Sequence, residues 1–227
     1  MYGLWIIFGI FALISWLISR QLQKKFKEYS KIPVFNNMTG RDVVEKMLRD
    51  HGIFDVKIGT VSGQLSDHYN PVNKTINLSK EVYFGSNVSA AAVAAHECGH
   101  AVQHAQAYSW LSLRSKLVPF VSFVSNWVQW VLLLGIIMVS SFPQLLLFGI
   151  ILFATTTLFS IITLPVEIDA SNRALVWLKS NGITSNYNHD KAKHALKLAA
   201  YSYVNAALMS LATLFYYIMI FIGGTDD

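Results

Sequence analysis

A histidine-containing motif in the middle of the chain has the residue types and the spacing of a metal site. His96-Glu97-Cys98-Gly99-His100 follows the pattern H-E-x-x-H inside an alanine-rich run, 91–104, that predicts a helix. Residues four apart lie on one face of a helix, so the imidazoles of His96 and His100 can converge on one ion. Glu97 lies beside that face, where its carboxylate can take a proton from a water that the metal has made acidic. The motif therefore indicates a zinc peptidase site that still needs one ligand.

The alternative interpretation is a pair of histidines on a solvent-exposed helix. It fits the neighbouring residues poorly, because the helix is largely apolar, which predicts burial. The apolar or small residues are 91–95, Cys98, Gly99 and 101–102. Buried histidine and glutamate side chains need partners, and a metal ion supplies one. We therefore favour the metal site.

The composition is that of a membrane protein. Of 227 residues, 53% are hydrophobic and only 14% are charged, and the mean hydropathy is positive. A soluble globular domain carries more charge than this. Cys98 is the single cysteine, which excludes an intramolecular disulfide.

Four apolar runs are long enough to span a bilayer. We predict spans at 1–19, 117–140, 144–164 and 203–222, followed by a tail at 223–227. The first run has no basic residue before its apolar core, and Arg20 and Lys24 follow it, so we interpret it as an anchor and not as a cleaved signal peptide. The second and third runs are so close together that they predict a helical hairpin.

The basic residues indicate an orientation. All 18 Lys and Arg residues fall within 20–116 and 165–202. The positive-inside rule therefore predicts that these two segments are cytoplasmic and that both termini lie outside. Nucleic-acid binding is the alternative use of such charge. We exclude it because the basic residues lie beside the spans and are not interleaved with aromatic ones.

The segment 20–116 predicts a small region of mixed α and β structure. Thr39 and Asp42 fit the start of a short helix that ends at Gly52. Ser86, Asn87 or Ser89 can cap the helix that carries the metal motif. Between these helices we predict strands at 55–58, 60–65 and 74–79, with a loop of turn-forming residues at 66–71.

Glu167 is the best candidate for the third ligand. It follows the third span on the side where the predicted topology also puts the motif, in an apolar stretch where a carboxylate needs a partner. Asp169 could orient a ligand histidine, and Arg173 could pair with either carboxylate. The alternative for both acids is stabilisation by a helix N-terminus.

His104 continues the spacing of the motif but fits less well as a ligand. It lies about 12 Å along the helix axis from His96, too far for both to bind one ion at about 2 Å. Gln103 and Gln106 occupy the positions of the glycine and the third histidine of the metzincin motif, which excludes that class. His104 could still contact substrate.

Short segments spread over the whole chain form a specific set: Thr39-Gly40, Ser66 to Pro71, Leu78-Ser79, Ala94 to Glu97, Gly99 to Ala101, Gln103-His104, Leu113 to Ser115 and Glu167 to Ser171. In these segments the chain resembles the bacterial neutral zinc metallopeptidases of the YugP type, nearly from end to end. More distantly it is similar to the HtpX and Ste24 membrane peptidases, in which a glutamate after membrane spans is the third ligand and an aspartate stands four residues beyond it. Here Ser171 occupies that position.

The resemblance implies how a substrate would be held. It implies that 74–79, which includes Asn77, is an edge strand above the metal helix and pairs with the main chain of an extended peptide. In the adjoining loop, His68 or Tyr69 could donate a hydrogen bond to the oxyanion of the tetrahedral intermediate. The alternative is a structural turn that the side chain of Asp67 caps.

The sequence thus predicts an integral membrane, mainly α-helical zinc endopeptidase with four transmembrane helices and a small α+β, zincin-like cytoplasmic portion, in the plasma membrane of a bacterium. His96, His100 and Glu167 bind one zinc ion per chain, and Glu97 is the general base. The predicted substrates are membrane proteins or peptides.

A zinc-binding scaffold without turnover is the alternative. A transporter is disfavoured because the spans carry no Asp, Glu, Lys, Arg or His. The oligomeric state is left open.

Overall fold

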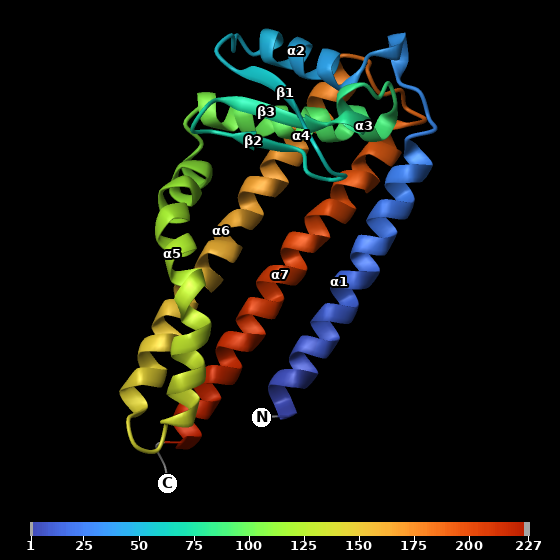
Figure 1. Cartoon of the computed structure of the whole chain (residues 1–227). Coiled ribbons are helices and arrows are strands. Elements are labelled where there is room, and N and C mark those ends of the chain that lie inside the picture. The colour runs from blue at the N-terminus through green and yellow to red at the C-terminus, as the bar shows by residue number, and fades with distance from the viewer. Residues whose placement is uncertain (1, 225–227) are drawn as a thin grey trace. The chain divides into compact units, whose positions relative to one another are not determined.

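The chain is mainly helical, with one small sheet, in a computed structural model that describes residues 2–224 (Figure 1). The predicted fold class is confirmed in this respect, including its four long apolar helices. Residue 1 of the first predicted span and residues 225–227 of the predicted tail lie outside the described residues. The elements are α1 (Tyr2–Tyr29), a 3-10 turn (Phe35–Asn37), α2 (Gly40–Asp50), β1 (Lys57–Val61), β2 (His68–Asn70), β3 (Thr75–Ser79), α3 (Lys80–Tyr83), α4 (Val88–Ala105), α5 (Ser109–Ile137), α6 (Pro143–Ser180) and α7 (His189–Gly224).

The chain divides into two compact units. The helical unit comprises Met1–Leu17, Ser112–Leu164 and Ser202–Asp227, and the mixed unit comprises Ile18–Leu111 and Pro165–Tyr201. The helices α1, α5, α6 and α7 contribute residues to both units, and each is long and apolar enough to cross a membrane. They extend beyond the predicted spans: α5 begins before residue 117, and α6 continues past residue 164.

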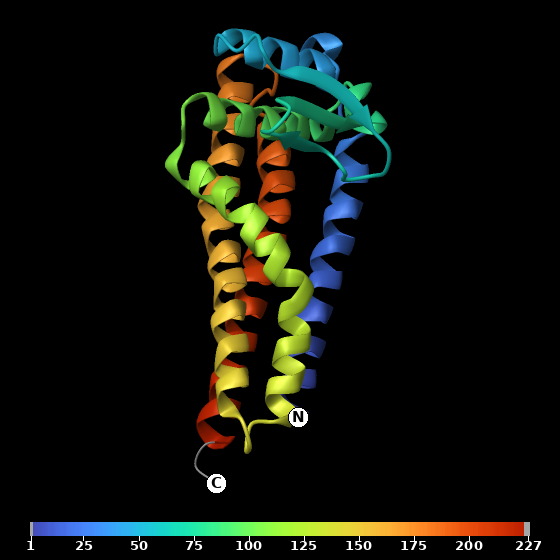
Figure 2. The same ribbon diagram turned by 60° about the vertical axis from the view of Figure 1, so that its left-hand side comes forward.

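The helical unit is held together by apolar packing and a few polar contacts. A short turn joins α5 to α6 as the predicted hairpin (Figure 2), and Leu132 of α5 packs with Leu146 of α6 and Tyr217 of α7. Asn205 of α7 donates a hydrogen bond to the hydroxyl of Ser15 on α1 at 2.6 Å, a polar contact between two of the long helices. Many other apolar side chains of this unit face outward, as lipid contact requires.

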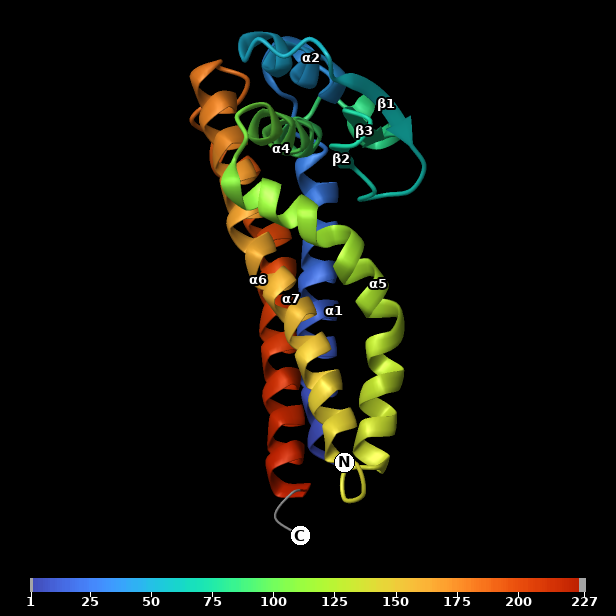
Figure 3. The same ribbon diagram turned by 90° about the vertical axis from the view of Figure 1, so that its left-hand side faces the viewer.

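The mixed unit packs a three-stranded sheet and α2 against α4 (Figure 3). Its core combines Val43 and Met47 of α2, Ile76 of β3, and alanines such as Ala91 and Ala95 of α4. The small alanine side chains let neighbouring elements approach α4 closely, which buries this helix as the sequence predicts. The expected caps are present: Thr39 and Asp42 form a capping box, and Asn87 caps α4.

The strand predictions need three corrections. The predicted strands 55–58 and 60–65 are one strand, β1, and residues 62–65 lie outside it. The order in the sheet is β1-β3-β2, so β3 is the central strand and not the predicted edge strand. The edge strand nearest α4 is β2, which lies inside the predicted loop 66–71. The carboxylate of Asp67 accepts a hydrogen bond from the amide of Ser79 at 2.7 Å, which fixes the next three residues in extended form beside β3. The turn begins only at Asn70, whose side chain accepts from the amide of Val72.

Candidate metal centre

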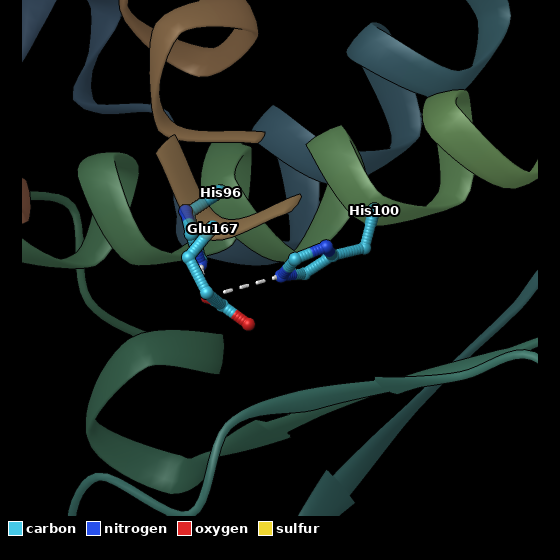
Figure 4. Close-up of side chains that lie close together, drawn as sticks. All are labelled: His96, His100 and Glu167. Atoms are coloured by element: carbon cyan, nitrogen blue, oxygen red, sulfur yellow. Dashed lines mark ion pairs between the residues drawn. The ribbon is translucent and has the colours of Figure 1, made fainter. Parts of the chain in front are cut away.

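His96 and His100 project from the same side of α4, and the carboxylate of Glu167 lies between them (Figure 4). The Oε2 atom of Glu167 is 3.3 Å from Nε2 of His96 and 3.5 Å from Nε2 of His100. Glu167 is only 3% exposed. The three residues that the sequence proposes as ligands are therefore brought together, although Glu167 comes from a different helix, α6.

These three donor atoms fit a zinc ion. Donors about 2.0–2.1 Å from a tetrahedral ion lie about 3.3–3.4 Å from one another by simple geometry, close to the two measured separations. All three atoms lie within 4.8 Å of one another. Two imidazoles and one carboxylate are also a donor set that zinc accepts, with a fourth position left for water or substrate. The residues present could thus hold the metal.

Nδ1 of each histidine, the ring nitrogen that is not directed at Glu167, has a hydrogen-bond partner. Nδ1 of His96 lies 3.1 Å from the hydroxyl of Ser171, and Nδ1 of His100 lies 3.0 Å from Oε1 of Gln103. Burial by itself lowers the pKa of His100, but the hydrogen bond and the charge of Glu167 outweigh it, so the pKa is raised. A metal that binds at this site would compete with protonation of His100, because a histidine ligand must be neutral.

Glu97 lies beside this cluster and is held by the edge strand. Its carboxylate Oε2 accepts a hydrogen bond from the main-chain amide of Tyr69 in β2 at 2.9 Å. Glu97 is 8% exposed. The amide of Tyr69 points away from β3 and toward α4, so the free edge of the sheet faces the candidate general base. This is the role of an edge strand that the sequence assigned to residues 74–79.

A glycine allows the two helices of the site to meet. A Cβ atom added to Gly99 would lie 2.7 Å from the carbonyl oxygen of Ala170, closer than real side chains come. Ala170 lies one turn of α6 beyond Glu167, so the contact at Gly99 sets how near Glu167 approaches His96 and His100. Gly99 is one of the two unspecified positions of H-E-x-x-H, and the sequence alone gave it no role.

We therefore expect Gly99→Ala to weaken metal binding as well as the fold. The added methyl group must push α6 away from α4, and such overpacking costs about 1–3 kcal/mol of stability. Zinc affinity and melting temperature of the purified protein should both fall. Gly9→Ala is the matched control, because its added Cβ meets nothing within 4 Å, and it should change neither quantity. Unchanged zinc affinity in Gly99→Ala would contradict the proposed importance of this helix contact.

Asp169 and Arg173 pair with each other and contact neither ligand histidine directly. Nε of Arg173 donates to Oδ2 of Asp169 at 2.5 Å, and the same oxygen accepts from Nε2 of Gln103 at 2.8 Å. Of the two carboxylates that the sequence offered to Arg173, the structure pairs it with Asp169. The predicted contact of Asp169 with a ligand histidine is replaced by a contact through Gln103.

The remaining residues proposed to contact the oxyanion or the substrate form hydrogen-bonded pairs with one another. Nδ1 of His68 lies 2.8 Å from the carbonyl oxygen of Ser66, and its Nε2 lies 3.1 Å from the amide nitrogen of Asn77. The hydroxyl of Tyr69 lies 2.7 Å from Nδ1 of His104, and burial raises the pKa of this phenol to about 12. In this conformation the polar side-chain atoms proposed for the oxyanion or the substrate are already engaged. The oxyanion role of His68 or Tyr69 stays a prediction.

Tyr69 and His104 also line a pocket of about 280 Å³ that includes Asp55 and Lys74. Tyr69 thus contributes both to this pocket and, through its main-chain amide, to the contact with Glu97, whereas Glu97 and the three converging residues do not line the pocket.

Comparison with known proteins gives the family. A family model described as "Putative neutral zinc metallopeptidase" matches residues 4–222. The chain is 40% identical over 225 residues to the "Putative membrane protease YugP" of Bacillus subtilis (strain 168), and the alignment covers 99% of each chain. No solved structure matches it. The resemblance seen in the sequence is confirmed, and the chain belongs to this family of neutral zinc metallopeptidases.

Proposed function

We propose that the protein is a membrane-embedded, zinc-dependent endopeptidase. The observation that carries the proposal is the convergence of Nε2 of His96, Nε2 of His100 and Oε2 of Glu167 (Figure 4), with Glu97 next to His96 on the same helix. The family and the name of the Bacillus relative support a peptidase in a membrane. The glutamate ligand from a second helix supports a gluzincin-like site with one zinc ion per chain.

Glu97 is the residue that moves protons in this proposal. A bound zinc supplies Lewis acidity, which activates a water molecule and polarises the peptide carbonyl. Glu97 accepts a proton from the water while the oxygen of that water attacks the carbonyl carbon. It then delivers the proton to the amide nitrogen, and the carbon–nitrogen bond breaks. The amide of Tyr69 holds the carboxylate in place for both transfers.

The edge strand supports an extended substrate. The outer edge of β2 faces Glu97, so a peptide that adds to this edge would run past the metal centre. The amide of Tyr69 is bonded to Glu97, so the peptide would pair with the other main-chain groups of the edge. Four long apolar helices in the same chain favour substrates that are membrane proteins or membrane-associated peptides.

Metal removal tests this function. Protein purified in detergent should cleave fluorescently labelled casein, lose that activity on chelation of the metal, and regain it when zinc is added back. The same protein should be tested on a labelled transmembrane peptide in lipid vesicles. Chelation should stop both reactions, because without zinc the water is not activated and the peptide carbonyl is not polarised. Activity that survives complete zinc removal would contradict the proposal.

We further propose that the mixed unit faces the cytoplasm of a bacterial cell and that both termini lie outside. All 18 Lys and Arg residues fall in the two segments 20–116 and 165–202, and basic residues near spans stay on the cytoplasmic side.

Thiol labelling tests the orientation. Cys98 is the single cysteine and is fully buried, so a Cys98→Ala background allows new cysteines to report their own accessibility. In intact cells, a membrane-impermeant thiol reagent should label Ser141→Cys in the turn between α5 and α6. It should label Ser62→Cys, in the exposed loop after β1, only after lysis. The reverse pattern would show that the orientation is inverted.

A further inference from the structure

Gln103 is a polar side chain on α4 that is fully buried, with 0% exposure. It lies three residues after His100, and every polar atom of its amide has a partner. Oε1 is 3.0 Å from Nδ1 of His100, and Nε2 donates to the carbonyl oxygen of Val166 and to Oδ2 of Asp169, each at 2.8 Å. A buried amide with all its hydrogen bonds made is strongly fixed in orientation.

The partners determine which end of the amide faces which group. The carbonyl of Val166 and the carboxylate of Asp169, which also accepts from Arg173, are acceptors only. The nitrogen of Gln103 must therefore face them, and it uses both of its hydrogens there. The amide oxygen then faces His100, and since this oxygen can only accept, Nδ1 of His100 must carry a hydrogen.

A hydrogen on Nδ1 leaves Nε2 as the metal-binding nitrogen of the neutral ring. That atom is the one directed at Oε2 of Glu167, 3.5 Å away. The other histidine is held differently, because Nδ1 of His96 faces the hydroxyl of Ser171, which can donate or accept. Only the contact of Gln103 with His100 dictates a tautomer.

We propose that Gln103 is a positioning residue of the metal centre, which fixes the ring orientation and the tautomer of His100 for zinc and links this ligand to the Asp169–Arg173 pair on α6. The inference rests on the proposed zinc site. It differs from a purely structural role, in which Gln103 only ties α4 to α6 through Val166 and Asp169.

Zinc affinity of the full-length protein in detergent, measured by competition with a chromophoric chelator, distinguishes the two roles. Loss of a hydrogen-bond partner behind a ligand histidine typically weakens metal binding about 10- to 100-fold, and we expect this for Gln103→Leu. The melting temperature of the zinc-free protein is recorded beside it. Gln64→Leu, the same change on an exposed residue in the loop between β1 and β2, is the control and should bind zinc like wild type.

A charge-swapped pair keeps the test informative if Gln103→Leu does not fold. Gln103→Glu can still accept from His100, but it lacks the hydrogens for Asp169 and repels its carboxylate, so zinc affinity should fall. Adding Asp169→Asn restores a donor opposite the new carboxylate and should recover part of the affinity. The absorption spectrum of the cobalt-substituted protein should change and recover in parallel, because it reports the geometry of the ligands.

Three results would overturn the inference. The first is a lower melting temperature of Gln103→Leu with a zinc affinity within about threefold of wild type, as a purely structural role predicts. Gln103→Glu could bind zinc no better with Asp169→Asn than without it, which would contradict the assigned amide orientation. Wild-type protein that binds no zinc at all would remove the proposed function together with this inference, whereas the first two results leave the zinc site intact.

Discussion

Replacement of Glu167 by Gln should largely abolish zinc binding. The amide has the same shape as the carboxylate but no negative charge, and it is a poor ligand for zinc, which takes carboxylate, imidazole or thiolate. The loss of affinity should exceed the 10- to 100-fold typical of residues that only support a ligand. Zinc per chain in detergent-purified protein, prepared without chelator, is the measurement, with one zinc per chain expected in wild type.

A surface acid provides the control for this experiment. Glu45→Gln removes one exposed carboxylate that pairs with Arg41 on α2, and it should retain wild-type zinc. Helical content by circular dichroism should be the same in both variants, because position 167 stays filled by a side chain of equal size. Full zinc in Glu167→Gln would contradict the assignment of Glu167 as the third ligand. No zinc in wild type would instead contradict the metal site itself.

Glu97→Gln should separate catalysis from metal binding. The amide cannot accept a proton from water, so cleavage should fall by about 10²- to 10⁴-fold, the usual contribution of a general base. Zinc content should stay near that of wild type, because Glu97 is not one of the three converging donors. Its replacement can still accept the hydrogen bond from the amide of Tyr69, so the surroundings should change little.

Cleavage of labelled casein and zinc content should be measured on the same preparations. Cleavage by Glu97→Gln at the wild-type rate would make us abandon the mechanism. A zinc-binding scaffold would behave in another way: wild type would bind zinc without cleaving any substrate, and Glu97→Gln would support the function in cells as well as wild type does. Loss of function with zinc retained is the result that only the peptidase predicts.

Much of the fold follows from local patterns. Apolar runs predict the long helices because a bilayer requires a certain length of uncharged helix. The capping box at Thr39 and Asp42 depends on residues only three apart, so it can be read directly. For the same reason, the spacing of His96 and His100 on one helix predicts that both imidazoles can face one ion. For α4 the sequence offers three candidate caps, and the structure identifies Asn87 as the one that bonds.

The sheet could not be predicted to the same extent. The residues of β3 have strand character, but whether a strand is central or at an edge depends on which distant segments pair with it. The short strand β2 contains Asn70 and precedes Pro71, which are turn formers, and it is extended because Asp67 bonds to Ser79 and β3 lies beside it. The strand that faces Glu97 was therefore assigned to the wrong segment.

The sequence by itself determined the helix that carries His96 and His100, the candidate general base beside them and the apolar helices, because each depends on spacing within one segment. Only the tertiary structure decided how α6 meets α4. That crossing is possible because Gly99 has no side chain against the main chain of Ala170. It puts Glu167 between the histidines and brings Asp169 to His100 through Gln103. Contacts between helices this far apart in the chain depend on three-dimensional packing, which no local spacing encodes.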